Sequence, residues 1–346
     1  MHTLNVAIAG SGYSAKVFHI PFLKQDQRFN VVKVYERNSE RAKAWLPNVT
    51  IVHTYDELLT DEVGLLIITT PNQTHYEMVK QALLAGKNVL VEKPLVATAC
   101  QARELADLAE QQGVVLYVYQ NRRWDSPIVT AKQILQQGLL GEVVDCEIRI
   151  DRYAKAKNVK VWKETGEQGT GLVYDLGVHL IDQAVHLFGK PEAVFADIRY
   201  QHDDALSDDN FELHLYYPNG LKVALMASKY VRETTSHFAL HGKLGSYVKK
   251  TVDQQESLLA QGVEPVGNWN DERSDFWGIL HTEQDGEVIR KSYPTVPSSY
   301  HTLYDNLYAT IHQTQAQTVK MTDVILVLEI IEKAFESAKE GRKVEI

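Results

Sequence analysis

The stretch that decides the fold is LNVAIAGSGYSA, residues 4–15. Its apolar beginning predicts a short buried strand, and the residues that follow have helical spacing. Between strand and helix stands Gly-x-Gly-x-x-Ala, which fits the turn that binds dinucleotides. In that turn Gly10 permits the tight bend, Gly12 leaves room for a pyrophosphate, and the alanine allows close packing of helix on strand. We predict a dinucleotide site here that includes Tyr13 and Ser14; the alternative is a tight turn without a ligand.

Strand and helix signals alternate through residues 1–120. The expected strands are almost continuously apolar, which is typical of a parallel sheet with helices on both faces. We therefore predict an α/β Rossmann dinucleotide-binding domain over 1–120, with its ligand at the carboxyl ends of the strands. A capping box at Thr98 and a glycine at position 113 bound one of the helices. Further strands are expected at 31–35, 51–53, 65–70, 88–92 and 114–119.

The pattern changes after Gln120. Apolar and polar residues alternate from Val144 to Asp151, as in a strand with one face in water. Ser126 followed by Pro127 predicts the N-cap and first residue of a helix. We therefore expect an α+β domain over 121–346, built on a largely antiparallel open sheet. Within this domain, the residues of 251–297 give no signal of function. Similar strand patterns recur at 193–200, 211–217, 221–227 and 237–241.

Composition narrows the function classes. The chain has 346 residues and a formal charge of −9, which argues against a nucleic-acid partner. Its two cysteines, Cys100 and Cys146, are too few for a disulfide framework or a four-thiolate zinc site. No apolar run approaches the ~20 residues that cross a bilayer. We expect a cytoplasmic protein whose partner is a small molecule.

Two charged residues end the second expected strand, Glu36 and Arg37. They lie ~20 residues beyond the glycine turn, where an acid would accept hydrogen bonds from the adenosine ribose of NAD. An arginine there would instead pair with the 2′-phosphate of NADP. The two residues favour opposite cofactors, so NAD and NADP both remain open, and both could also be solvated loop charges.

Lys93 follows the strand expected at 88–92. A lysine at the carboxyl end of a parallel strand points into the ligand crevice. Pro94 restricts the conformation of the residue before it, which fixes where the ammonium points. The alternative is an ordinary surface lysine.

A titratable stripe runs along the helix expected to end at Gly189. At ~100° per residue, Asp175, His179, Asp182 and His186 fall within about 60° of one another. A histidine one turn after an aspartate suits general-base chemistry. The same spacing also suits a metal, although no strong third ligand except Asp182 is near, and we predict no metal. Structural hydrogen bonds are the other alternative, above all for Asp182 and His186.

With these features in place, the chain resembles the Gfo/Idh/MocA oxidoreductases over nearly its whole length. The family's marks are AGSGYSA, TTPNQTH at 69–75, VEKP at 91–94 and YDLGVHLID at 174–182. Three further motifs, Asn121–Asp125, Asp151–Tyr153 and His186–Gly189, are similar to the branch that contains NADP-dependent scyllo-inositol dehydrogenase.

The resemblance implies a role for each matching residue. Lys93 would hydrogen-bond the reacting oxygen, His179 would take the hydroxyl proton, and Asp175 would hold a neighbouring hydroxyl. It also implies a homodimer or homotetramer formed through the second sheet. Thr70, Pro71, Asn72, His75 and Glu92 would line the cofactor, and Asn121, Arg122, Tyr153 and Trp162 would border the sugar pocket, Asn121 on its cofactor side.

Two positions depart from the branch. NADP-using relatives carry a small or basic residue where Glu36 stands, and Ala154–Lys155 replaces their usual Arg-Pro. We expect hydride transfer between a nicotinamide and a secondary alcohol of a polyol or sugar. The alternatives are a non-catalytic nucleotide-binding regulator on the same fold and a metal hydrolase that uses the titratable stripe.

Overall fold

The structure is a computed structural model that describes residues 3–155 and 164–346. Its backbone divides into two compact units. The first contains residues 1–120 together with 254–270 and 299–324, and the second contains 121–253, 271–298 and 325–346. We expected a single division near Gln120. The structure adds two later segments to the first unit, and no local sequence pattern marks them.

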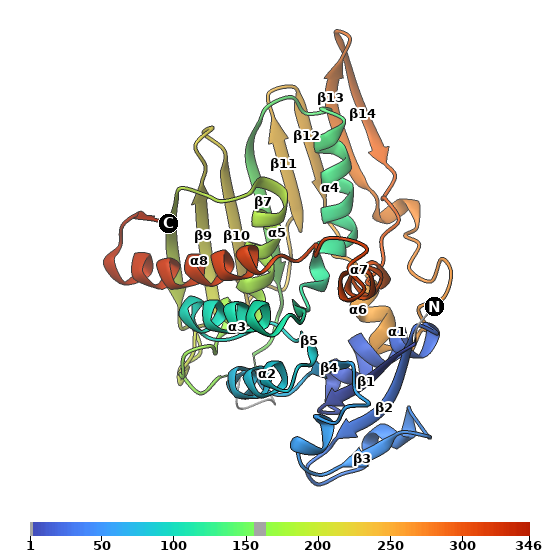
Figure 1. The fold of residues 1–346 in the computed structure, drawn as a ribbon. Helices are drawn as coiled ribbons and strands as arrows, with labels where there is room; N and C mark the ends of the chain where they lie inside the picture. Colours follow the sequence, from blue (N-terminus) through green and yellow to red (C-terminus); the bar gives the residue numbers. More distant parts are fainter. Residues whose placement is uncertain (1–2, 156–163) are drawn as a thin grey trace. The chain divides into compact units, whose positions relative to one another are not determined.

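The first unit is built on a six-stranded sheet, drawn in blue and cyan in Figure 1. All its strand pairs are parallel, in the order β3-β2-β1-β4-β5-β6. The chain therefore reverses its winding direction between β1 and β4, which is where such sheets bind ligands. The strands are β1 (Leu4–Ala9), β2 (Phe29–Tyr35), β3 (Thr50–Val52), β4 (Leu65–Ile68), β5 (Asn88–Val91) and β6 (Leu116–Val118).

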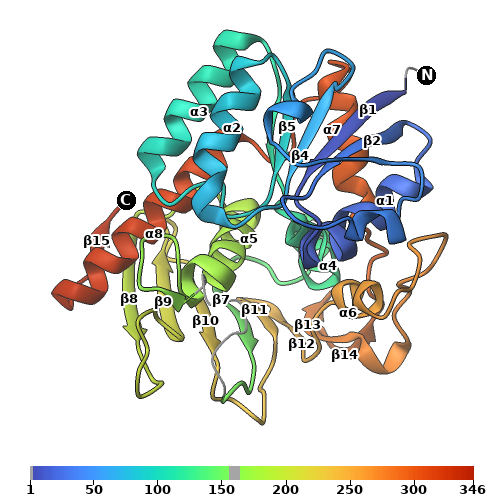
Figure 2. The ribbon, with the colours of Figure 1, turned by 90° about the horizontal axis from the view of Figure 1, so that it is seen from below.

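Helices cover both faces of this sheet, as Figure 2 shows. Helices α2 (His75–Leu84) and α3 (Ala99–Gln112) cover one face, and α1 (Ile20–Gln25) and α7 (His301–Ile311) cover the other. Burial on both sides explains why all four residues of β4 have no exposed surface. The capping prediction for α3 is confirmed, because the Thr98 side chain accepts from the Gln101 N–H and Gly113 has a φ of 65°. A shorter helix, α6 (Gln255–Ala260), completes the unit.

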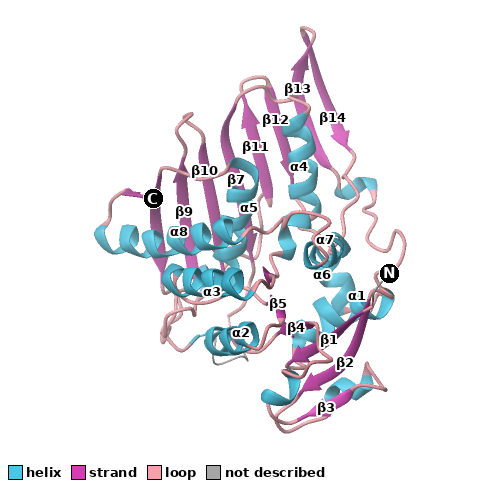
Figure 3. Ribbon diagram, in the orientation of Figure 1, coloured by secondary structure: helices cyan, strands magenta, loops and turns pink. Residues whose placement is uncertain are grey.

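The second unit contains a nine-stranded sheet, shown in magenta in Figure 3. Its order is β14-β13-β12-β11-β7-β10-β9-β8-β15, and among its described strands only β7 and β10 pair in parallel. The largely antiparallel sheet is thus confirmed. Its strands are β7 (Val143–Asp151), β8 (Ala193–Arg199), β9 (Asn210–Tyr216), β10 (Lys222–Ser228), β11 (Phe238–Gly242), β12 (Gly245–Lys249), β13 (Gly278–Gln284), β14 (Glu287–Tyr293) and β15 (Val344–Glu345).

One face of this sheet lies against helices α4 (Ser126–Gln136), α5 (Val178–Phe188) and the later part of α8 (Met321–Glu340). The alternation expected from the sequence follows this arrangement, because Cys146 and Ile148 of β7 have no exposed surface whereas Glu147 is exposed. Within the described residues, no helix is long and apolar enough to cross a membrane.

The start of α4 corrects one prediction. Ser126 is the first residue of the helix, and Asp125 takes the N-cap position. The reason is a distant carboxylate, because Asp253 Oδ2 accepts the Ser126 N–H at 2.7 Å. A side chain 127 residues away thus satisfies a donor of the first turn, a partner that local sequence does not reveal.

Candidate active site

The glycine turn follows β1 directly in the first unit. Gly10 has a φ of 98°, a conformation that favours glycine, and the space is tight because a Cβ added there would lie 3.1 Å from Thr69 Oγ1. A Cβ added at Gly12 would meet no described atom within 4 Å. Gly12 is therefore not required by packing, and the space beside it fits an approaching pyrophosphate.

The helix after this turn begins as a π-helix, Ala15–His19, before α1 continues it. Pro21 stands at the start of α1. Single π turns are rare and occur frequently at functional sites. Tyr13 is 44% exposed next to the turn, with its ring edge against Phe18.

Glu36 lies at the end of β2 and is only 4% exposed. Its carboxylate accepts the N–H groups of Arg41 at 2.8 Å and Ala42 at 2.6 Å, and the Ser39 hydroxyl. Although burial acts against ionisation, these donors lower the pKa of Glu36. The side chain thus organises the loop after β2, and Arg37 beside it is exposed.

His75 joins the loops after β4 and β5. Its ring is 1% exposed, with Nε2 2.9 Å from the Thr70 carbonyl oxygen and Nδ1 2.9 Å from that of Pro94. Burial lowers the pKa of His75 and favours the neutral ring. The ring thus lies between the segments on which Thr70, Pro71, Asn72 and Lys93 stand, and in its neutral form it donates a hydrogen bond to one of the two carbonyls.

Glu92 and Lys93 come directly after β5. The Glu92 carboxylate receives the Ser14 hydroxyl and lies 3.1 Å from His19 Nε2, while its other oxygen accepts the Lys93 N–H at 3.2 Å. The predicted cofactor residues Ser14 and Glu92 are thus brought together beside Lys93. The Lys93–Pro94 peptide bond is cis.

The second unit carries Asp175 on another π-helix, Val173–Gly177, and His179 on α5, which continues it. Gly171 starts this segment with a φ of 94°, and a Cβ there would lie 2.0 Å from Asp208 Oδ1. Asp208 Oδ2 accepts the Val173 N–H at 2.7 Å. Burial raises the pKa of Asp208 to about 7. Sequence reasoning missed Asp208, whose only signal is a polar Asp-Asp pair before a strand.

Two residues of the titratable stripe, Asp182 and His186, contact charged side chains of other segments. Asp182 forms a two-fold hydrogen-bonded pair with Arg123, at 2.8 and 2.7 Å, and both side chains are at most 2% exposed. His186 lies 3.3 Å from Lys132 Nζ, and burial together with Arg123 and Lys132 lowers its pKa to about 3. Both therefore have structural partners, in line with the structural alternative.

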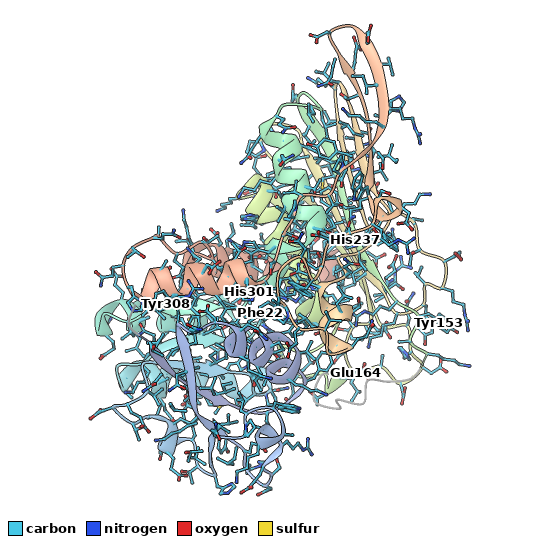
Figure 4. The ribbon with its side chains drawn as sticks, turned by 90° about the vertical axis from the view of Figure 1, so that its right-hand side faces the viewer. Phe22, Tyr153, Glu164, His237, His301 and Tyr308 are labelled. Carbon is cyan, nitrogen blue, oxygen red and sulfur yellow. The ribbon has the colours of Figure 1, made fainter. Side chains whose placement is uncertain are left out.

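The expected sugar-pocket residues have different surroundings. Asn121 is buried, and Arg122 pairs with Asp125 at 3.3 Å and accepts from Gln183 through its carbonyl at 3.0 Å. Tyr153 is 43% exposed, and the Arg232 guanidinium lies 3.8 Å from its ring centre. Figure 4 shows Tyr153 near the edge of this unit. Trp162 lies outside the described residues.

Metal ligation has no support in the described part of the chain, where no group of three or more His, Cys, Asp or Glu side chains could hold an ion. The nucleotide features, in contrast, match a known family. Residues 4–120 match "Oxidoreductase family, NAD-binding Rossmann fold", and residues 132–346 match "Oxidoreductase family, C-terminal alpha/beta domain". The chain belongs to the Gfo/Idh/MocA oxidoreductases.

Relatives of this Gfo/Idh/MocA chain match it from end to end. It is 35% identical over 344 residues to scyllo-inositol 2-dehydrogenase (NADP(+)) IolW of Bacillus subtilis, covering 99% of this chain and 96% of that protein. The crystal structure of a putative oxidoreductase from Bacteroides fragilis is 41% identical, with a TM-score of 0.92 and full coverage of both chains. Bacillus subtilis yvaA, a putative oxidoreductase, is 34% identical with a TM-score of 0.95, covering 100% and 99%.

Family membership makes the chain an NAD(P)-dependent oxidoreductase. The nucleotide fold, the glycine turn and the residues after β5 agree with that class. The family does not fix the preference between NAD and NADP.

Proposed function

We propose that the protein transfers a hydride reversibly between a nicotinamide and a secondary alcohol carbon of a polyol or sugar. The observation that carries the proposal is the cluster after β5, where Glu92 connects Ser14 of the glycine turn to Lys93. Through Glu92, this arrangement joins the backbone at Lys93 to the glycine turn. The similarity to an enzyme named for scyllo-inositol supports the polyol class.

Each residue of the proposed site has its own role in the reaction. When bound, the nicotinamide accepts or donates the hydride. The Lys93 ammonium hydrogen-bonds the substrate oxygen and stabilises the negative charge that develops on it. His179 takes the hydroxyl proton, and Asp175 orients the substrate by holding a second hydroxyl.

The remaining assignments belong to the same proposal. The nucleotide contacts Gly10, Gly12, Tyr13, Ser14, Arg37 and the Thr70–Asn72 loop, while Glu36 and His75 hold the loops around it. Asn121, Arg122 and Tyr153 border the polyol. The active form is a cytoplasmic homodimer or homotetramer.

Separate fluorescence titrations with NADH and NADPH test the nucleotide site. We expect saturable binding, after which inositols and aldoses are screened with the tighter cofactor. Binding without turnover on any polyol would favour a non-catalytic nucleotide-binding regulator. Absence of binding by both cofactors would overturn the proposal.

A substitution at Gly12 sharpens this test. Gly12→Val places a side chain in space that no described atom fills, so we expect an unchanged melting temperature. The same side chain occupies the space proposed for the pyrophosphate, so binding should weaken at least ~10-fold, which corresponds to ~1.4 kcal/mol. Gly10→Ala is the contrasting variant, because its φ of 98° predicts a lower melting temperature. Normal cofactor binding by Gly12→Val would contradict the placement.

A further inference from the structure

A buried histidine that the proposed mechanism does not use lies next to Glu92. His19 has no exposed surface, and its Nε2 is 3.1 Å from Glu92 Oε1. The same oxygen receives the Ser14 hydroxyl, and the other accepts the Lys93 N–H at 3.2 Å. One carboxylate therefore connects the glycine turn, the helix after it and the lysine after β5.

The π-helix explains how Ser14 and His19 reach one carboxylate. They are five residues apart, which is the hydrogen-bonding period of a π-helix. In an α-helix, at ~100° per residue, five residues turn through about 500°, which would direct the two side chains ~140° apart. The π turn over Ala15–His19 thus has a specific geometric consequence at Glu92.

The other side of the imidazole is held by α7. The Tyr304 hydroxyl lies 2.8 Å from His19 Nδ1, and the Tyr119 ring packs at 4.4 Å from the imidazole. An ionised carboxylate only accepts hydrogen bonds, so the Nε2 that faces Glu92 carries a proton. Tyr304 also packs against Phe22 of α1. Figure 4 shows Phe22 beside His301, which lies on α7 with Tyr304.

We propose that His19 is a positioning residue for Lys93: its Nε2–H, oriented by Tyr304, keeps the Glu92 carboxylate ionised and fixed against the backbone of Lys93. The role of Lys93 in turnover rests on the proposed function, whereas the action of His19 on Glu92 does not.

The charge of Glu92 depends on few groups. Burial would raise its pKa, but the hydrogen bond and the electrostatic attraction of His19, the hydrogen bond from Ser14 and the nearby charge of Lys93 lower it. Within the described residues, other titratable groups that interact with it include Tyr119, Tyr304 and His75. Burial raises the pKa of both tyrosines and lowers that of His75, so all three are neutral near pH 7. Loss of the His19 donor therefore removes a main support of the ionised form.

A substrate-free measurement tests this first step. Carbon NMR of protein labelled at glutamate carboxyls, compared with Glu92→Gln, reports the protonation of Glu92. We expect a carboxylate at pH 6 in the wild type and in His19→Gln, whose amide N–H group can donate to Glu92. His19→Leu should show a protonated Glu92 at pH 6, because burial then outweighs the remaining donors. An ionised Glu92 in His19→Leu would overturn the proposal.

Kinetics test the second step with NADP⁺ and scyllo-inositol as the first probe pair. We expect His19→Leu to lower kcat about 10²-fold at pH 6, the size of loss that a 1 Å misplacement causes. The loss should be smaller at pH 8, where Glu92 ionises again, and KM should change little. A loss of equal size at both pH values would indicate a merely structural role and overturn the proposal.

Two tyrosines form a matched pair of controls. Both hydroxyls reach the Phe18 carbonyl, at 3.1 Å for Tyr304 and 2.8 Å for Tyr119, but only that of Tyr304 also reaches His19. Tyr304→Phe should shift the Glu92 titration in the direction of His19→Leu, and Tyr119→Phe should not. Equal behaviour of the two would contradict the proposal, and the pair remains decisive if His19→Leu does not fold. If no polyol is oxidised, the proposed function fails, and the NMR result still decides what His19 does to Glu92.

Discussion

Alanine at Lys93 or His179 should lower turnover by about 10²–10⁴-fold, because each removes a group that assists proton transfer or stabilises charge in the reaction. Cofactor affinity should change far less, since the glycine turn and the loop after β2 stay intact. Steady-state kinetics on the polyol found by screening, together with cofactor titration of each variant, measure the two effects separately.

The controls come from the same elements. His186→Ala removes an imidazole two turns further along α5, beside Lys132, and should keep turnover near that of the wild type. Lys93→Met preserves the length of the side chain but not its charge, and should be as impaired as alanine if the ammonium matters. Wild-type turnover by Lys93→Ala or His179→Ala would refute the assignment of these residues.

The second large effect is expected on stability. Asp182→Asn keeps the shape of the side chain but removes the negative charge that pairs with the buried Arg123 guanidinium, with both side chains at most 2% exposed. Breaking one partner of a buried pair typically costs about 3–5 kcal/mol. We expect the loss of stability to disturb the position of His179 as well, because Asp182 and His179 lie on the same helix, α5. Urea unfolding followed by circular dichroism measures the loss.

Asp275→Asn provides the matched comparison. Asp275 also pairs with an arginine through two hydrogen bonds, but its side chain is 55% exposed and that of Arg273 79%. An exposed pair is worth at most ~1 kcal/mol. Similar stability losses in the two variants would show that burial of the Arg123–Asp182 pair does not govern its contribution.

Local signals predicted the nucleotide half of the fold well. Gly10, Thr98 and Gly113 act through backbone geometry within a few residues, so their roles follow from sequence. Most of the expected strand positions agree with the structure. Burial on both faces of the sheet requires continuous apolar runs, and these are also local signals. The β6 strand is shorter than expected, Leu116–Val118 instead of 114–119.

The candidate site was harder to predict where partners lie far apart in the chain. Helical spacing placed Asp182 on the stripe, but its partner Arg123 is 59 residues away. The expected hydrogen bonds of Glu36 with a ribose stay a prediction, and the sequence did not reveal that its carboxylate also binds its own loop. Spacing identifies a face of a helix or the end of a strand, and it does not identify the donor that occupies a carboxylate.

The first unit is built from three separate segments of the chain, and this determines when it can fold during synthesis. Helix α7 supplies Tyr304, Asn306 and Tyr308, which contact His19, Tyr117 and Phe29 of the N-terminal part. A nascent chain that ends near residue 120 lacks these partners, so its aromatic surface stays open to water and to other chains. Co-translational completion of the nucleotide-binding half must therefore wait until almost the whole polypeptide has left the ribosome, and an isolated 1–120 fragment should aggregate.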